Sequence, residues 1–260
     1  MQTIAILSRK GGVGKTATAH ALGAGLKRRG YKVLFVDLDS QGNLTFSTGA
    51  AAGRANAYDL LTGAADAEDA ITRTQQGDII TASPNLAGAD IMITERRKEY
   101  RLKEALQEVA GNYDFCVIDT PTTLGILTAN ALTAANGVII PAQAEIFSLQ
   151  GLVLLQETVA AVKKSSNPAL SVYGILLTRF NTRTVISRDM RENLEQVAAA
   201  LKTKVYAEPI RECAAVPEAQ ARQQSVFEYA PRRNPAKDYN AFIDELLQDI
   251  GGRGNAKERL

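Results

Sequence analysis

Residues 8–16 read Ser8-Arg9-Lys10-Gly11-Gly12-Val13-Gly14-Lys15-Thr16, and this stretch decides the fold. It follows an apolar run from Thr3 to Leu7 and opens an alanine-rich helical run, so it predicts a glycine-rich turn between a strand and a helix. Such a turn directs several backbone N–H groups into one concavity at the positive end of a helix dipole, which suits phosphate. We therefore expect Lys15 to contact the β- and γ-phosphates of a nucleotide and the Thr16 hydroxyl to bind Mg²⁺.

Two further apolar runs end in aspartates. Residues 33–39 read Val33-Leu-Phe-Val-Asp37-Leu-Asp39, and residues 113–121 read Tyr113-Asp-Phe-Cys-Val-Ile-Asp119-Thr-Pro121. Continuous apolar strands are typical of a parallel sheet that is covered on both faces. Ligands bind at the carboxyl ends of such strands, so Asp39 is expected beside the phosphates and Asp119 at the Mg²⁺ ion, opposite Thr16.

Buried strands alternate with helices along the rest of the chain. Strands are predicted over 137–142 and 171–178, with helices over 66–72, 125–135, 148–164 and 235–250, and helical spacing over 85–109. This alternation predicts a doubly wound α/β fold, with a mainly parallel sheet and helices on both faces. We expect one phosphate-loop domain over residues 1–250 and a frayed, disordered tail over 251–260.

Composition excludes several classes of protein. The formal net charge of +2 rules out a generally basic coat for nucleic acid but leaves room for a basic patch. Cys116 and Cys213 have no neighbours at ligand spacing, which argues against a metal centre or a disulfide framework. His20 is expected to be a packing or surface residue and not a catalyst, because no acid or nucleophile flanks it. No apolar run approaches the length of a membrane span and no leader precedes the first strand, so a cytoplasmic location is expected.

The pattern Lys10-Gly-Gly-Val-Gly-Lys15-Thr16 resembles the deviant Walker A loop of the ParA/MinD family of P-loop ATPases. The strict loop pattern has glycine at position 9, where this chain has Arg9, and the chain adds Lys10. The resemblance implies that ATP and Mg²⁺ are bound and that a homodimer forms on ATP. In that dimer Lys10 reaches the phosphates of the partner's nucleotide, while Lys15 serves its own. It also implies slow hydrolysis by a water that Asp39 orients, at a metal site formed by Thr16, Asp39 and Asp119.

The resemblance extends from Thr3 to about Leu247 and is strongest to the Soj-like ParA proteins that partition chromosomes, plasmids and integrative elements. It includes the segments Tyr58-Asp-Leu-Leu, Pro84-Asn-Leu-Ala-Gly-Ala, Phe180-Asn-Thr-Arg-Thr and Glu218-Ala. It implies a ParB-type centromere-binding partner, and no helix-turn-helix precedes the first strand, so DNA binding is expected to be non-specific. The nucleotide-binding residues that it implies are Lys10, Gly11, Gly12, Val13, Gly14, Lys15, Thr16 and Ala17 at the phosphates, and Thr178, Arg179, Pro209, Ile210 and Arg211 beside the adenine.

Basic residues in the second half of the chain are the candidates for contact with double-stranded DNA. We hypothesise that the dimer brings together patches formed by Arg183, Arg188, Arg222, Arg232, Arg233 and Lys237, with Arg211 a further candidate. Contacts of this kind release counterions, so binding should weaken steeply with salt. The chain departs from Soj-like relatives at Ala214-Ala215, a stretch where they often carry an additional arginine.

Four alternatives compete with this interpretation. A MinD-like membrane ATPase needs a C-terminal amphipathic helix, but residues 251–260 hold three glycines and hardly any apolar residue. A nitrogenase-type iron protein needs cysteines that bridge two subunits around a cluster, and the two unmatched cysteines of this chain argue against that class. A tyrosine kinase on this loop usually ends in a tyrosine cluster, which this tail lacks. The fourth alternative is a DNA-binding positioning factor that uses ATP only as a conformational switch, with negligible turnover.

Overall fold

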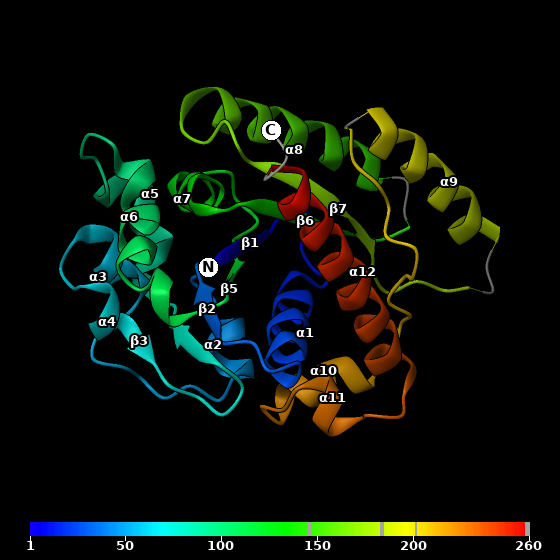
Figure 1. Cartoon of the computed structure of the whole chain (residues 1–260), viewed down its shortest axis with the longest axis horizontal. Helices are drawn as coiled ribbons and strands as arrows, with labels where there is room; N and C mark the ends of the chain where they lie inside the picture. Colours follow the sequence, from blue (N-terminus) through cyan, green and yellow to red (C-terminus); the bar gives the residue numbers. More distant parts are fainter. Residues whose placement is uncertain (145–146, 183–184, 201, 258–260) are drawn as a thin grey trace.

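A seven-stranded sheet forms the centre of the computed structural model, which describes residues 1–144, 147–182, 185–200 and 202–257 (Figure 1). The strand order is β3-β4-β2-β5-β1-β6-β7, and all neighbouring pairs are parallel except β3 and β4. The strands are β1 (Gln2–Ile6), β2 (Val33–Asp37), β3 (Ile71–Thr72), β4 (Asp78–Ile80), β5 (Phe115–Asp119), β6 (Gly137–Ala142) and β7 (Ser171–Leu177). The mainly parallel, doubly wound α/β fold is therefore confirmed.

Helices connect the strands and cover both faces of the sheet (Figure 1). The α-helices are α1 (Lys15–Arg28), α2 (Asn43–Ser47), α3 (Ala57–Thr62), α4 (Ala67–Ala70), α5 (Ala89–Met92), α6 (Arg101–Glu108), α7 (Ile126–Ala134), α8 (Phe147–Ser165), α9 (Val185–Ala200), α10 (Ala215–Ala221), α11 (Val226–Tyr229) and α12 (Asn234–Lys257). Short 3₁₀ turns are formed by Pro84–Gly88, Lys98–Tyr100 and Ala110–Asn112.

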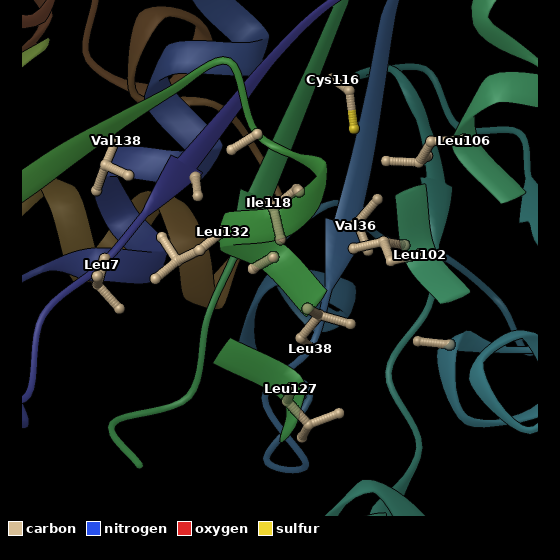
Figure 2. Packing of buried hydrophobic residues seen from close by; sticks show 14 of the residues in the cluster. Leu7, Val36, Leu38, Leu102, Leu106, Cys116, Ile118, Leu127, Leu132 and Val138 are labelled. Carbon is tan, nitrogen blue, oxygen red and sulfur yellow. The ribbon is translucent and has the colours of Figure 1, made fainter. Parts of the chain in front are cut away.

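The central strands are buried on both faces, as their continuous apolar sequences predict. In β5, Phe115 and Val117 join one core cluster with residues of α1, α11 and α12, whereas Cys116 and Ile118 join another with residues of α3, α6, α7 and α8. Figure 2 shows part of the second cluster, in which the labelled leucines of α6 and α7 lie close to β2 and β5. Burial on both faces fixes the register of the strands, because a one-residue slip would exchange the two clusters.

Helix α1 lies between the sheet and α12, and two glycines permit this close packing. A Cβ atom on Gly23 would lie 2.1 Å from the ring of Phe35 in β2, and one on Gly25 would lie 2.3 Å from Cδ1 of Ile243 in α12. The helix that begins at the phosphate loop is therefore held firmly on both sides, which fixes the loop at its amino end.

The strand order brings the predicted site residues to one edge of the sheet. Strand β5 lies between β1 and β2, and its register pairs Asp119 with Ile6 on one side and with Asp37 on the other. Because all three strands are parallel, the segments that follow their carboxyl ends meet at that edge.

Two segments differ from the sequence expectations in the second quarter of the chain. The helix expected over 66–72 ends at Ala70, and Ile71 and Thr72 form β3, because β-branched residues favour a strand when a partner such as β4 is available. The helical pattern over 85–109 is interrupted at Ile93, which is extended, and at Arg97, whose φ of 63° is left-handed. Residues 93–97 thus separate α5 from the 3₁₀ turn that leads into α6.

The last helix is longer than expected. The sequence predicts that it ends at Ile250 before a frayed tail, but α12 continues through Gly251 to Lys257. Once a helix is nucleated, each further residue adds one backbone hydrogen bond, so two glycines in sequence do not have to end it. Residues 258–260 of the expected tail lie outside the described part of the chain.

Candidate active site

The phosphate loop joins β1 to α1, as the sequence predicts. Gly12 and Gly14 have φ values of 73° and 83°, which side-chain-bearing residues rarely adopt, so these two positions need glycine. Gly14 is the N-cap of α1 and no side chain caps that helix end. The first N–H groups of a helix have no intrahelical partner, and together with the helix dipole they attract an anion. Lys15 is only 8% exposed and stands at the first position of the helix.

Thr16 and Asp119 are in direct contact. The Thr16 hydroxyl donates a hydrogen bond of 2.7 Å to Oδ2 of Asp119, while Oδ1 of Asp119 is buried and has no hydrogen-bond partner in the described structure. Burial and, to a smaller extent, the nearby carboxylate of Asp37 raise the pKa of Asp119 to about 8. The unpartnered carboxylate oxygen and the neighbouring hydroxyl together form a pair of oxygen ligands suited to a hard cation such as Mg²⁺.

The two aspartates after β2 have different roles. Asp37 is fully buried: its Oδ1 accepts from the backbone N–H of Asp39 at 3.1 Å, and its Oδ2 accepts from the N–H and the hydroxyl of Thr45 at 2.8 Å each. Burial raises the pKa of Asp37 to about 6. Asp39 is half-buried and lines the cleft. Asp37 therefore shapes the turn into α2, and Asp39 is the carboxylate that can meet a ligand.

A cleft of about 760 Å³ opens in front of the loop. Its lining includes the loop residues Gly11, Gly12, Gly14, Lys15, Thr16 and Ala17 and also Asp39. Other segments contribute Phe46, Leu86, Asp90, Pro121, Thr122, Thr123 and Gln220, among others. Val13 does not line the cleft, because its side chain is 1% exposed and its carbonyl oxygen accepts a hydrogen bond of 2.7 Å from the Thr178 hydroxyl.

A second cleft of about 520 Å³ shares Gly12, Gly14 and Ala17 with the first. Four of the five residues expected beside the adenine line it, namely Thr178, Arg179, Ile210 and Arg211, whereas the buried Pro209 does not. Gln220 lines both clefts and was not identified from the sequence.

Both arginines of the second cleft, Arg179 and Arg211, have carboxylate partners. Arg211 donates two hydrogen bonds to the buried Asp238, at 3.0 Å from Nε and 2.5 Å from Nη2, and this contact raises the pKa of Arg211. Arg179 pairs with Glu212 at 2.7 Å. Arg211 is thus a fixed part of the wall of the cleft, which makes it a poor candidate for the DNA contact that the sequence suggested.

Lys10 lies at the rim of the loop and is half-buried. Its Nζ donates to Oε1 of Gln143 at 3.2 Å, and Nε2 of Gln143 donates to the carbonyl oxygen of Gly12 at 3.4 Å. Gln143 follows β6 directly, so its place is set by the sheet, and it is a second residue that sequence reasoning missed.

The other candidate residues lie outside the two clefts. Four of them are exposed: Arg222 directly after α10, Arg232 and Arg233 between α11 and α12, and Lys237 on α12. Arg183 lies outside the described residues, and Arg188 is on α9, with a side chain that is also not described. Figure 1 draws α9, which carries Arg188, well apart from α10 and α11, so Arg188 does not share a patch with Arg222 in one subunit.

His20 is a packing residue, as expected. It is 3% exposed, its Nε2 lies 2.6 Å from Oε1 of Gln76, and burial lowers its pKa. Over the described ranges, no group of three or more His, Cys, Asp or Glu residues forms a cage for a metal. Mg²⁺ rarely uses such a cage and is bound instead through one or two protein ligands and phosphate oxygens. Within the same ranges, no helix is long and apolar enough to cross a bilayer.

Comparison with known proteins gives concordant results. Residues 1–172 match the family model described as an AAA domain. The chain is 41% identical over 248 residues to the sporulation initiation inhibitor protein Soj of Bacillus subtilis (strain 168), covering 94% of this chain and 97% of that protein. It is 38% identical over 255 residues to the chromosome-partitioning ATPase Soj of Treponema pallidum (strain Nichols), covering 97% and 99%. A crystal structure of cobyrinic acid a,c-diamide synthase from Mycobacterium smegmatis, with bound ADP and magnesium, is similar with a TM-score of 0.84, 35% identity and 96% of each chain covered.

Proposed function

The chain belongs to the ParA/MinD family of P-loop ATPases, and on that premise we propose that it partitions DNA by cycling between a monomer and an ATP-bridged dimer. It is an ATPase whose cofactors are ATP and Mg²⁺. The observation that carries the proposal is the cleft that the phosphate loop, Thr16 and Asp39 line together, with the buried Asp119 hydrogen-bonded to Thr16. The dimer binds double-stranded DNA without sequence preference, and a ParB-type centromere-binding protein stimulates its turnover.

The residues present fit a Mg²⁺ ion. Thr16 and Asp119 would hold it, because the unpartnered, buried Oδ1 of Asp119 lies next to the hydroxyl of Thr16. When bound, Mg²⁺ joins phosphate oxygens and neutralises part of their charge. Asp39, which lines the same cleft, is an additional candidate for the metal site.

The protein groups around the cleft divide the work of hydrolysis. The backbone N–H groups of residues 11–16 and the ammonium group of Lys15 bind the phosphates and stabilise the charge that develops on them. Asp39 orients the attacking water, because it is the half-buried carboxylate in the cleft, whereas Asp37 is fully engaged by Thr45 and the backbone of Asp39.

The partner subunit completes the site through its copy of Lys10. In one chain Lys10 is held beside its own loop by Gln143, at 3.2 Å. Dimerisation would move this ammonium group to the phosphates of the facing subunit, where it adds a second positive charge. Hydrolysis would then remove the γ-phosphate and weaken the dimer, so that DNA is released.

DNA contact is proposed for six basic residues, and the four of them whose side chains are described are exposed and line neither cleft. These residues are Arg183, Arg188, Arg222, Arg232, Arg233 and Lys237. Each phosphate contact made by such a residue steepens the salt dependence of binding by about one unit of slope.

The experiment measures phosphate release with ATP alone, with random duplex DNA, and with DNA plus the product of the reading frame next to this gene. The proposal expects slow release alone and the fastest release when all components are present. The variant Arg232→Glu/Arg233→Glu should bind random duplex DNA more weakly in filter assays with ATP, with a salt slope reduced by about two units. The variant Arg183→Glu/Arg188→Glu should show the same loss of DNA affinity and the same reduction in salt slope.

The control is Lys163→Glu/Lys164→Glu, which makes the same change in charge at exposed positions near the end of α8. Unchanged DNA affinity in both arginine variants, or an equal loss in the lysine control, would contradict the DNA assignment. Phosphate release that responds to cobyrinic acid but not to DNA would favour a synthase instead. Negligible release under every condition, together with ATP-dependent DNA binding, would favour a nucleotide switch.

A further inference from the structure

Helix α7 begins beside the cleft without a side-chain cap of its own. Its N-cap is Gly125, and the segment 120–124 that precedes it follows Asp119 directly in the chain. Pro121, Thr122 and Thr123 form part of the wall of the phosphate cleft, which the loop also lines. The position of this helix end therefore decides how closely that wall approaches a bound nucleotide.

Asp90, from α5, supplies the missing cap. Its Oδ1 accepts a hydrogen bond of 2.6 Å from the backbone N–H of Ile126, the first residue of α7. The carboxylate lies directly on Gly125, because a Cβ atom added there would be 2.3 Å from Oδ2 and 2.4 Å from Oδ1. A negative charge at a helix N-terminus is favourable, and here it comes from a separate helix 36 residues earlier in the sequence.

Two other contacts fix the remainder of the segment. The Thr120 hydroxyl donates to the carbonyl oxygen of Ile6 at 2.7 Å, and the Thr128 hydroxyl donates to the carbonyl oxygen of Thr123 at 2.7 Å. The first contact anchors the segment to the sheet, and the second anchors it to α7 itself. Among the hydrogen bonds of the described residues, the contact with Asp90 is the one that ties this wall of the cleft to α5, and Asp90 itself lines the cleft.

We propose that Asp90 is a positioning residue for ATP hydrolysis, acting with Gly125 to hold residues 121–125 at the distance from the phosphates that the reaction requires. It acts through the backbone of α7 and not as an acid or a base. The inference rests on the ATPase activity and not on DNA or partner binding, so ATP and Mg²⁺ alone suffice to test it. Failure of the partitioning proposal would leave this test intact.

The test compares kcat, KM and the dissociation constant of a fluorescent ATP analogue for Asp90→Ala, Asp90→Asn, Gly125→Ala and the double variant Asp90→Ala/Gly125→Ala. Loss of a cap predicts a fall in kcat of about fivefold or more for Asp90→Ala, with the dissociation constant within about twofold of the original. Asp90→Asn keeps an oxygen acceptor for the N–H of Ile126 and should recover most of the rate. Rates are read at the plateau of a protein titration, so that a change in self-association is not mistaken for a change in rate.

The double variant isolates the contact itself. Gly125→Ala should lower kcat because its new methyl group meets the carboxylate of Asp90, and removal of that carboxylate should relieve the clash. The double variant should therefore be no slower than Asp90→Ala, which is a non-additive result. Near-UV circular dichroism checks that each variant is folded, and if Gly125→Ala does not fold, the pair Asp90→Ala and Asp90→Asn still decides the question.

Asn56→Ala is the matched control, because it also removes a helix cap. Asn56 caps α3 by accepting a hydrogen bond of 2.9 Å from the N–H of Tyr58, and it does not line the cleft. The proposal expects kcat of this variant to stay within about twofold of the original, because a twofold change in rate corresponds to only a small change in activation free energy. An unchanged kcat in folded Asp90→Ala, an equal fall in Asn56→Ala, or additive effects of Asp90→Ala and Gly125→Ala would each overturn the proposal.

Discussion

Replacement of Asp119 by asparagine should stabilise the protein in the absence of nucleotide and metal, while it weakens Mg²⁺-dependent hydrolysis. The carboxyl of Asp119 is fully buried, and its Oδ1 has no hydrogen-bond partner in the described structure. Asparagine keeps an oxygen that can accept from the Thr16 hydroxyl but carries no charge. The variant therefore removes an electrostatic cost that the native site sustains for its function.

The sign and size of the effect follow from the pKa. Burial raises the pKa of Asp119 to about 8, so between about pH 5 and about pH 7 this carboxyl is protonated in the folded chain and ionised in the unfolded one. The folded state then binds more protons than the unfolded state, and the free energy of unfolding falls as pH rises. Over these two pH units the free energy of unfolding of the wild type falls by about 2–3 kcal/mol through Asp119, and the variant does not show this fall. Asp37, whose pKa is raised to about 6, adds a smaller loss that both proteins share.

The assay is urea denaturation of the apo-protein in EDTA, followed by circular dichroism at about pH 5 and about pH 7. Relative to the wild type, the variant should gain about 1 M in urea midpoint, or about 7 °C in Tm, between the two pH values. Asp114→Asn, at an exposed position just before the same strand, is the control and should keep the wild-type dependence on pH. A variant whose advantage is absent, or is the same at both pH values, would refute the argument from the buried charge.

Two other substitutions test the loop and the packing behind it. Lys10→Ala should leave ATP binding largely intact but abolish the ATP-dependent dimer, and an undiminished dimer population in light scattering would refute the cross-subunit role. Gly23→Ala should lower the free energy of unfolding by about 2 kcal/mol, because its methyl group meets Phe35, whereas Gly111→Ala, with no atom within 4 Å of the added Cβ, should have little effect. Chemical denaturation compares the pair, and equal stabilities would show that the sheet accommodates the methyl group.

Local sequence was sufficient to predict the parts of the site that follow a strand directly. The glycine-rich loop after β1, Asp39 after β2 and Asp119 at the end of β5 each combine an apolar run with a turn or a carboxylate, and parallel pairing brings them together. The contact between Thr16 and Asp119 was predictable for the same reason.

Other residues of the site could not be predicted in this way. Gln143, Asp90 and Gln220 are single polar residues on different elements, and neither periodicity nor spacing distinguishes them from solvated side chains. Their roles depend on contacts between segments far apart in the sequence. Similarly, β3 is a strand because β4 lies beside it, and a local pattern contains no information about that neighbour.

A crystal structure with Mg²⁺ and a non-hydrolysable ATP analogue tests the central claim most directly. The account predicts two subunits facing each other, with each triphosphate enclosed by residues 10–16, the metal between the Thr16 hydroxyl and Asp119, and each Lys10 released from Gln143 toward the opposite nucleotide. A nucleotide bound elsewhere, or a single chain in which Lys10 still contacts Gln143, would contradict it.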